Sequence, residues 1–120
     1  MNIHFYSKSD DYEIEFFTNA NEEEGFIVFK DESLDNSFIK MKILPQELLF
    51  DRFGDVSMKI SFIEGLKTSG KYKNSMGLEF DFEAFTKKLK IESNIIELSY
   101  DLLIDGSHNN SCDIIVRMNN

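Results

Sequence analysis

Several residue types that mark common protein classes are scarce in this sequence of 120 residues. Its only cysteine is Cys112, so the chain forms no internal disulfide, and the disulfide-rich secreted folds are excluded. Two histidines and one cysteine are also too few for the four nitrogen or sulfur ligands of a structural zinc site. We therefore expect neither a metal nor a cofactor.

Positive charge is scarce as well. The sequence has 13 basic and 22 acidic residues, and its net charge of -9 repels the phosphate backbone of nucleic acids and the surface of acidic membranes. Lys67, Lys71 and Lys73 form a local basic cluster, which we interpret as a solvated surface. We therefore expect no nucleic acid partner and no membrane partner.

Long apolar segments are absent too. No run approaches the roughly 20 apolar residues of a membrane-spanning helix, and the N-terminal MNIHFYSKSDDY lacks the apolar region of a secretory signal. These absences predict a cytoplasmic protein.

The apolar residues that are present are sufficient for one core. Hydrophobic residues make up 42% of the chain and aromatic residues 13%, with 12 phenylalanines and no tryptophan. A length of 120 residues fits a single domain, which we place at 1–120. The core must be built mainly from Phe, Ile and Leu.

Apolar residues alternate with polar ones along much of the chain, which is the pattern of β-strands with one buried face. In residues 55–62 the apolar positions are Val56, Met58, Ile60 and Phe62. The same alternation marks 78–84, 96–104 and 112–118, and shorter runs follow it in the first half. Polar turns about every 10 residues predict an antiparallel meander of about eight to ten strands.

Such a meander closes into a barrel or folds into a sandwich, because both arrangements protect the strand edges. We expect an all-β fold with a single antiparallel β-barrel. Two segments, 45–53 and 83–90, have apolar spacings that also fit one or two helical turns. A short helix in each segment is the alternative.

The second half of the chain carries spaced residues that resemble a known family. The set comprises Arg52-x-Gly54-x-Val56-x-Met58, Phe62-x-x-Gly65, Tyr72, Gly77, Thr86 and Ile96-x-Leu98-x-Tyr100-x-Leu102. Together they resemble the YwiB-like family of small bacterial proteins of unknown function, over about residues 25–118. The resemblance implies a calycin-like, or lipocalin-like, antiparallel β-barrel in a cytoplasmic protein, and it implies no activity, substrate or catalytic residue. At Tyr72-Lys73-Asn74 the sequence departs from the Tyr-x-Thr that the family pattern predicts.

No group of residues predicts catalysis by a nucleophile and a base. His4 and His108 both fall at positions that we expect to be exposed. Cys112 shares the apolar parity of its strand, which predicts a buried and unreactive thiol. We therefore expect that the protein is not an enzyme.

Three acids, Glu79, Asp81 and Glu83, share one face of a strand. Successive carboxylates lie about 7 Å apart, a spacing that also suits the acid pair of a glycosidase. Lys88 and Lys90 follow in the next run and offer cross-strand partners. We favour a solvated face whose charges are paired.

The first functional hypothesis is a small ligand held at one open end of the barrel. A barrel of about eight strands is either just filled by side chains or holds one small molecule. We expect an apolar or amphipathic ligand. Its site would consist of Arg52 as the handle for an anionic group, Tyr72 and Tyr100 as hydrogen-bonding groups, and Met58 and Phe62 as the apolar wall.

The second hypothesis is a protein-interaction module whose barrel is filled by its own side chains. Many large residues fall on the inward parity, among them Phe50, Phe62 and Phe82, which favours a filled interior. The contact surface would be the acidic outer face or an apolar patch. That patch would combine the apolar residues at otherwise polar positions: Phe17, Phe53, Phe85, Leu103 and Ile115.

The direction of Arg52 depends on the length of one turn, in the stretch DRFGDVSM. A two-residue turn at Gly54-Asp55 sends Arg52 outward, because a register change of one residue moves every side chain to the other face. A three-residue turn pairs Phe50 with Met58 and points Arg52 inward. The match of these two apolar residues favours the inward arginine.

Overall fold

The fold consists of strands joined by turns and loops: the computed structural model describes residues 1–120 and contains ten β-strands. In chain order they are β1 (Asn2–Ser9), β2 (Glu13–Glu23), β3 (Phe26–Lys30), β4 (Ser37–Leu44), β5 (Glu47–Gly54), β6 (Ser57–Phe62), β7 (Lys67–Lys73), β8 (Glu79–Glu92), β9 (Ile95–Ile104) and β10 (Ser107–Asn119). The structure holds no helix long and apolar enough to cross a membrane.

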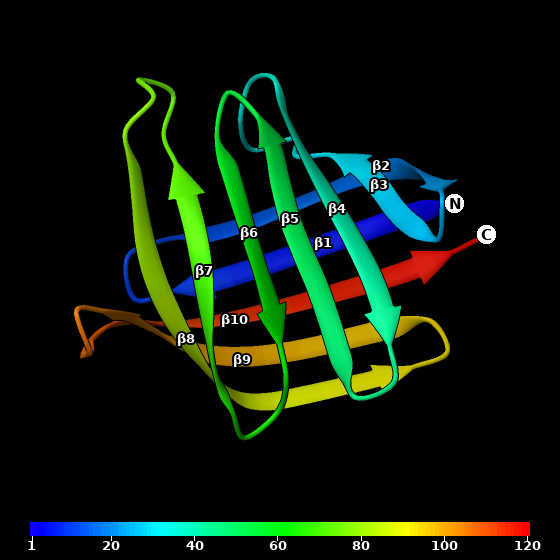
Figure 1. The fold of residues 1–120 in the computed structure, drawn as a ribbon. Coiled ribbons are helices and arrows are strands. Elements are labelled where there is room, and N and C mark those ends of the chain that lie inside the picture. Colours follow the sequence, from blue (N-terminus) through cyan, green and yellow to red (C-terminus); the bar gives the residue numbers. More distant parts are fainter.

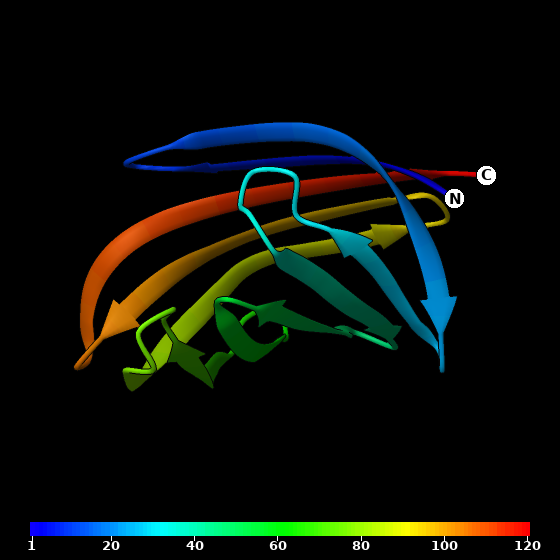
Figure 2. The ribbon, with the colours of Figure 1, turned by 90° about the horizontal axis from the view of Figure 1, so that it is seen from above.

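Each strand pairs in antiparallel fashion with the next one in the chain, and β1 closes the barrel by pairing with β10. The predicted all-β antiparallel barrel is therefore confirmed, at the upper end of the expected strand number. Strands β4 to β7 cross β1, β10 and β9 at a steep angle (Figure 1), and the view from above separates these groups into two layers (Figure 2). We call β4 to β7 the front layer, and β1, β9 and β10 the back layer.

Two long strands connect the layers. β2 has 11 residues and β8 has 14. The register of β8 on β9 shifts between Thr86 and Lys88, and the register of β10 on β9 shifts between His108 and Asn110. Bulges of this kind bend a strand and increase its twist, which lets β8 begin beside the front layer and end beside the back layer.

Neither of the two short helices forms. Residues 83–90 lie inside β8, and residues 45–53 consist of a turn followed by most of β5. Pro45 and Gln46 make that turn, in which Gln46 has a φ of 61°. The extended form prevails because β5 pairs with β4 on one side and with β6 on the other, so tertiary pairing outweighs local spacing.

Side chains fill the space between the layers. A cluster of 19 buried hydrophobic residues occupies it. Within the cluster, the ring centroids of Phe50 and Phe62 lie 6.2 Å apart, and those of Phe5 and Phe16 lie 5.0 Å apart. Phe62 also contacts the ring of Tyr100, at 4.7 Å between centroids. The large residues on the inward parity thus pack against one another in the core.

β7 is the strand that the alternation does not reveal. Its sequence, KTSGKYK, has one large apolar residue, Tyr72. Gly70 is nonetheless buried, because it lies opposite Phe82 of β8 and a Cβ atom at Gly70 would come within 2.5 Å of that ring. An aromatic ring from the neighbouring strand therefore supplies the apolar cover that the β7 sequence lacks.

The turn between β5 and β6 is longer than either length considered for it. Arg52 lies opposite Met58, and Phe50 lies opposite Ile60, where the three-residue turn predicts Met58. The difference amounts to two residues along β6, and a shift of two keeps every side chain on its face. Arg52 therefore points inward, as the alternative with the inward arginine predicts, although the predicted turn length was wrong.

Gly54 sets the length of this turn. Its φ is 116°, and it lies opposite Ser37 at the start of β4. A Cβ atom at Gly54 would overlap the carbonyl oxygen of Asn36, so a larger residue requires the backbone to move. The same carbonyl accepts a hydrogen bond from the amide of Asp55 at 3.0 Å. Contacts with the start of β4 thus fix how β5 turns into β6.

Candidate functional site

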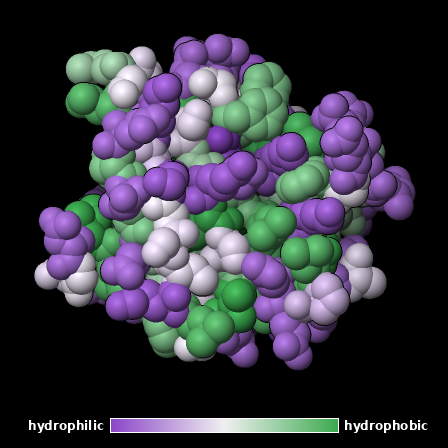
Figure 3. Space-filling model, viewed as in Figure 1, coloured by the Kyte–Doolittle hydropathy of each residue, from purple (hydrophilic) through white to green (hydrophobic).

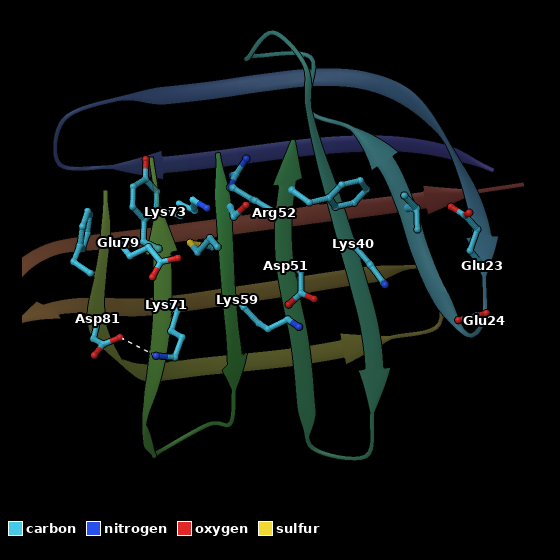
Figure 4. A pocket seen from close by; sticks show the side chains of 16 residues that line it. Glu23, Glu24, Lys40, Asp51, Arg52, Lys59, Lys71, Lys73, Glu79 and Asp81 are labelled. Atoms are coloured by element: carbon cyan, nitrogen blue, oxygen red, sulfur yellow. Dashed lines mark hydrogen bonds and ion pairs between the residues drawn. The ribbon is translucent and has the colours of Figure 1, made fainter. Parts of the chain in front are cut away.

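A large hollow lies on the outer surface of the front layer. Its volume is about 740 Å³, which falls in the range of about 300 to 1,000 Å³ typical of ligand pockets. Its lining residues come from strands β2 to β8, and Figure 4 labels the charged side chains. We call it the lysine hollow and define it by the cations at its centre: Lys40, Lys59, Lys71 and Lys73.

Strand register explains why these side chains share one face. Residues directly opposite one another in a sheet point to the same side. One such row crosses five successive strands: Lys40, Asp51, Lys59, Lys71 and Asp81. Figure 4 shows these side chains on the same outer side of the sheet.

The centre of the lysine hollow is positively charged and largely unpaired. Lys71 lies 3.3 Å from a carboxylate oxygen of Asp81. No carboxylate oxygen lies within 4.0 Å of the amino groups of Lys40, Lys59 or Lys73. Lys59 and Lys71 face each other in the ladder, and like charges at directly opposite positions destabilise a sheet.

Asp51 is the single acid at the centre of the row. Burial raises the pKa of its carboxyl group, and the positive charges of Lys59 and Lys40 lower that pKa by less. Neither lysine is close enough to form an ion pair with it. Asp51 therefore neutralises the neighbouring cations only in part.

Acidic residues close both ends of the lysine hollow. Glu23 and Glu24 stand at one end, at the tip of the β2–β3 hairpin, and Glu79 and Asp81 stand at the other end, on β8 (Figure 4). Figure 3 shows hydrophilic side chains spread over this face of the molecule, with smaller hydrophobic areas between them. The hollow thus has a basic centre and acidic ends.

The five predicted ligand-binding residues fall into two groups. Arg52, Met58 and Tyr72 lie side by side in register on β5, β6 and β7, on the inner face of these strands, and all three also line the lysine hollow. Phe62 and Tyr100 contact each other, and Phe62 is fully buried in the core. The structure therefore brings three of the five together at one place and puts the other two in a second contact.

Arg52 already has a partner inside the barrel. Its guanidinium pairs with Asp31, whose side chain is 1% exposed. Asp31 also accepts hydrogen bonds from Ser33, one from the hydroxyl and one from the amide at 3.0 Å. The Arg52 guanidinium lies 5.7 Å from the ring centroid of Phe50. These contacts give the arginine a structural role that competes with its predicted role as an anionic handle.

Tyr100 and Cys112 face each other on β9 and β10. Burial raises the pKa of Tyr100 well above its usual value, and it also raises the pKa of the Cys112 thiol. Cys112 is free and buried, as predicted. Both groups stay protonated at neutral pH, so the thiol is a poor nucleophile. On the other side of Tyr100, Thr86 of β8 has a buried hydroxyl without a hydrogen-bond partner.

The acids of β8 pair with lysines other than the predicted ones. Asp81 pairs with Lys71 at 3.3 Å, and Glu83 with Lys67 at 3.8 Å, both across the β7–β8 ladder. Lys88 instead pairs with an acid of β9 at 2.8 Å. The face is solvated and partly charge-paired, as expected, but its partners come from β7. No three His, Cys, Asp or Glu side chains lie close enough together to hold a metal ion.

The five apolar residues at polar positions do not form one patch. Phe17, which is 73% exposed, stacks on His4 of β1 at 4.4 Å between centroids. Phe53 stacks on Phe38 of β4 at 5.3 Å and lines the lysine hollow. Phe85 lies on β8, and the remaining two lie half-buried on β9 and β10. Their spread over five strands leaves Phe53 as the one that joins the candidate site.

The sequence does not reveal the lysine hollow as a unit. It places Lys71 and Lys73 in one local cluster, but their link to Lys59 and Lys40 runs across the ladder and not along the chain. The available signal was the polar parity of Lys59, which lies between two apolar residues of β6 and so must face outward.

Comparison with known proteins shows the family. A family described as Domain of unknown function (DUF1934) matches residues 3–116. The crystal structure of the ywiB protein from Bacillus subtilis is similar, with a TM-score of 0.69 and 22% sequence identity, over 99% of this chain and 91% of that chain. No curated protein matches the sequence. The chain therefore belongs to the DUF1934 family, whose function is unknown, and its resemblance to the YwiB-like proteins is confirmed.

Proposed function

We propose that this protein is a non-enzymatic binding module in which a packed barrel supports the lysine hollow as the contact site for a partner protein. The observation that carries the proposal is the location of the free space. A hollow of about 740 Å³ lies on the outer surface, while a core of 19 buried hydrophobic residues occupies the interior. A barrel filled by its own side chains serves as a rigid support, and function then depends on its surface.

The chemistry of the lining favours a protein partner over a small molecule. Small-molecule sites are mostly apolar and enclose most of the ligand. The lysine hollow is open, and 5 of its 16 lining residues are hydrophobic. Protein interfaces have a polar, solvent-accessible rim around their apolar contacts. The mostly polar lining of the hollow resembles such a rim.

Site-directed cross-linking tests this proposal. Cys112 is buried and its pKa is raised by burial, so a cysteine introduced on the surface becomes the reactive one. Ser57 lies in the lysine hollow, and Ser93 is exposed in the turn between β8 and β9. We expect a thiol-directed cross-linker on Ser57→Cys to capture a partner in a lysate of the source cells, and the same linker on Ser93→Cys to capture none.

The identity of the captured protein comes from mass spectrometry of the cross-linked peptides. Capture that is equal for the two variants, or absent from both, overturns the proposal.

A second candidate is a small amphipathic ligand at the part of the hollow that Arg52, Met58 and Tyr72 line. The ring of Phe80 favours it: the ring lies 4.8 Å from that of Tyr72, between centroids, yet remains 48% exposed. Native mass spectrometry of the gently purified protein tests this candidate. A bound small molecule that is lost in Phe80→Ser supports it, and an unmodified protein mass rejects it.

A further inference from the structure

The lysines of the hollow repel one another, and a bound anion would lower this electrostatic free energy. Lys59 and Lys71 are directly opposed, and the amino groups of Lys59 and Lys73 lack a carboxylate oxygen within 4.0 Å. Lys71 has only the exposed Asp81 as a partner, at 3.3 Å. A carboxylate placed between Lys59 and Lys71 adds two attractions that offset the repulsion between the two cations. The same centre therefore becomes favourable when an acidic side chain occupies it.

The row of cations is short, and this limits the length of the anion. Lys40 on β4 and Lys71 on β7 are three strand spacings apart, which is about 14 Å at about 4.8 Å per spacing. An extended peptide covers that distance with about four residues. Beyond this span, Glu24 at one end and Asp81 at the other repel further negative charge.

We infer that the lysine hollow binds a short acidic segment of a partner protein, with its carboxylates concentrated in about four residues. The inference rests on the proposed function and names the chemistry of the partner. One carboxylate lies between Lys59 and Lys71, and a second reaches Lys73. The ring of Phe53 contacts an apolar side chain next to them, and neutral or basic residues flank the acidic ones because the ends of the hollow are acidic.

Two other anionic occupants fit the site less well. The phosphates of a nucleic acid continue past the basic centre into the acidic ends, and the net charge of -9 repels a long polyanion. A second copy of this chain offers the acidic run Glu22–Glu24. Glu22 and Glu23, however, are held in the ladder with β3 and are not free to extend across another hollow.

Fluorescence anisotropy with a labelled peptide, Gly-Ser-Asp-Glu-Glu-Ser-Gly, tests the inference on the full-length protein. We expect this peptide to bind, its affinity to fall as salt is added, and a peptide with Asn and Gln in place of the acids not to bind. Lys59→Glu is expected to weaken binding by about tenfold, because it turns an attraction into a repulsion. Lys59→Arg keeps the charge and should retain the affinity.

A matched control separates the site from general charge effects. Lys8→Glu changes the net charge by the same amount as Lys59→Glu, at an exposed position of β1. An equal loss of affinity in both variants, or no peptide binding by the wild-type protein, overturns the inference. Tighter binding of a single-stranded oligonucleotide than of the peptide overturns it in favour of a nucleic acid. Self-association that Lys59→Glu abolishes, measured by sedimentation, overturns it in favour of a second copy.

Failure of this inference can be told apart from failure of the proposed function. Partner capture by the cysteine at position 57 that persists when Lys59→Glu is added supports the binding module and overturns the acidic partner. Peptide binding that depends on Lys59, without any capture of a partner protein, supports the anion site and overturns the interaction module.

Discussion

The outer faces of the front and back layers differ in how their lysines are paired with acids. Where β8 meets the back layer, two of its lysines pair with acids of β9: Lys88 with Glu97 at 2.8 Å, and Lys87 with Asp101 at 3.0 Å. The hydrogen bond from Lys88, with its positive charge, lowers the pKa of Glu97. On the front layer, Lys67 and Lys71 of β7 also pair with acids of β8, but Lys59 faces another lysine and has no acid within ion-pair distance.

The barrel fold does not require its surface lysines to be unpaired. Both faces are built by the same antiparallel ladder and the same alternation of inward and outward residues. The architecture accommodates paired charges, as the back layer shows, so unpaired lysines on the front layer are not imposed by the barrel. A local departure from favourable pairing of this kind is typical of functional surfaces.

The largest expected effect on stability comes from a substitution that displaces the turn between two strands of the front layer. We expect Gly54→Ala to lower the free energy of unfolding by on the order of 3 kcal/mol, because a methyl group combines a positive φ with overlap of the Asn36 carbonyl. Gly65→Ala is the matched control: its φ is 81°, but no atom lies within 4 Å of the added carbon. Its cost should be about 1 kcal/mol. Urea denaturation measures both, and equal costs would show that the contact with β4 does not hold the turn.

The next largest effect on stability comes from comparing two positive charges of the front layer: Arg52, which points inward, and Lys71, which points outward. Arg52→Met leaves the carboxylate of Asp31 buried and uncompensated, which should cost about 3 kcal/mol. Lys71→Met removes a pair in which both side chains are highly exposed, and should cost less than about 0.5 kcal/mol. Adding Asp31→Asn to Arg52→Met should recover part of the loss. Similar costs for the two single variants in urea denaturation would contradict the buried role of Arg52.

Asp51→Asn tests the electrostatics of the hollow itself. Because burial raises the folded-state pKa of Asp51 above its unfolded value, stability is lost as the pH rises through the folded pKa. The variant lacks this loss, so it should be more stable than the wild type at neutral pH, by less than about 1 kcal/mol. The advantage should disappear in acid, where the carboxyl is protonated in both states. Urea denaturation as a function of pH measures the difference, and an advantage that grows toward acid pH would be inconsistent with this sign.

The smallest expected effect is a change in the free energy of unfolding that has opposite signs for two lysine substitutions, one at Lys59 and one at Lys88. Lys59→Thr removes one of two opposed cations, and we expect it to stabilise the barrel by about 0.5 kcal/mol. Lys88→Thr removes a hydrogen-bonded ion pair and should destabilise it slightly. Thermal unfolding of the two variants at low salt measures both changes. Changes of the same sign would remove the distinction between the layers.

The barrel could be predicted because most strands carry their own signal. Residues 55–62 and 112–118 alternate so regularly that a buried face follows from the sequence alone. β7 carries no such signal, because the buried position Gly70 is covered by the ring of Phe82 from another strand. The alternation of apolar and polar residues cannot identify a strand, such as β7, whose apolar cover comes from a neighbouring strand.

The candidate site depended on contacts that the sequence does not encode locally. The inward direction of Arg52 followed from parity, but its partner Asp31 lies 21 residues away in a loop. The lysine hollow requires the register of five strands at once, and the β5–β6 register depends in turn on the carbonyl of Asn36. Each of these is a tertiary contact, so residue spacing alone could not supply it.

Closure of the barrel requires the first strand, β1, to pair with the last strand, β10, which is synthesised much later. Asn2 of β1 lies opposite Asn119 of β10, and the N- and C-termini lie side by side in Figure 1. During synthesis, β1 therefore waits for the last strand before its second edge is covered, and such distant pairings fold slowly. An uncovered edge pairs readily with strands of other chains. The contact that leaves the finished protein without a free sheet edge thus makes the unfinished chain prone to aggregate.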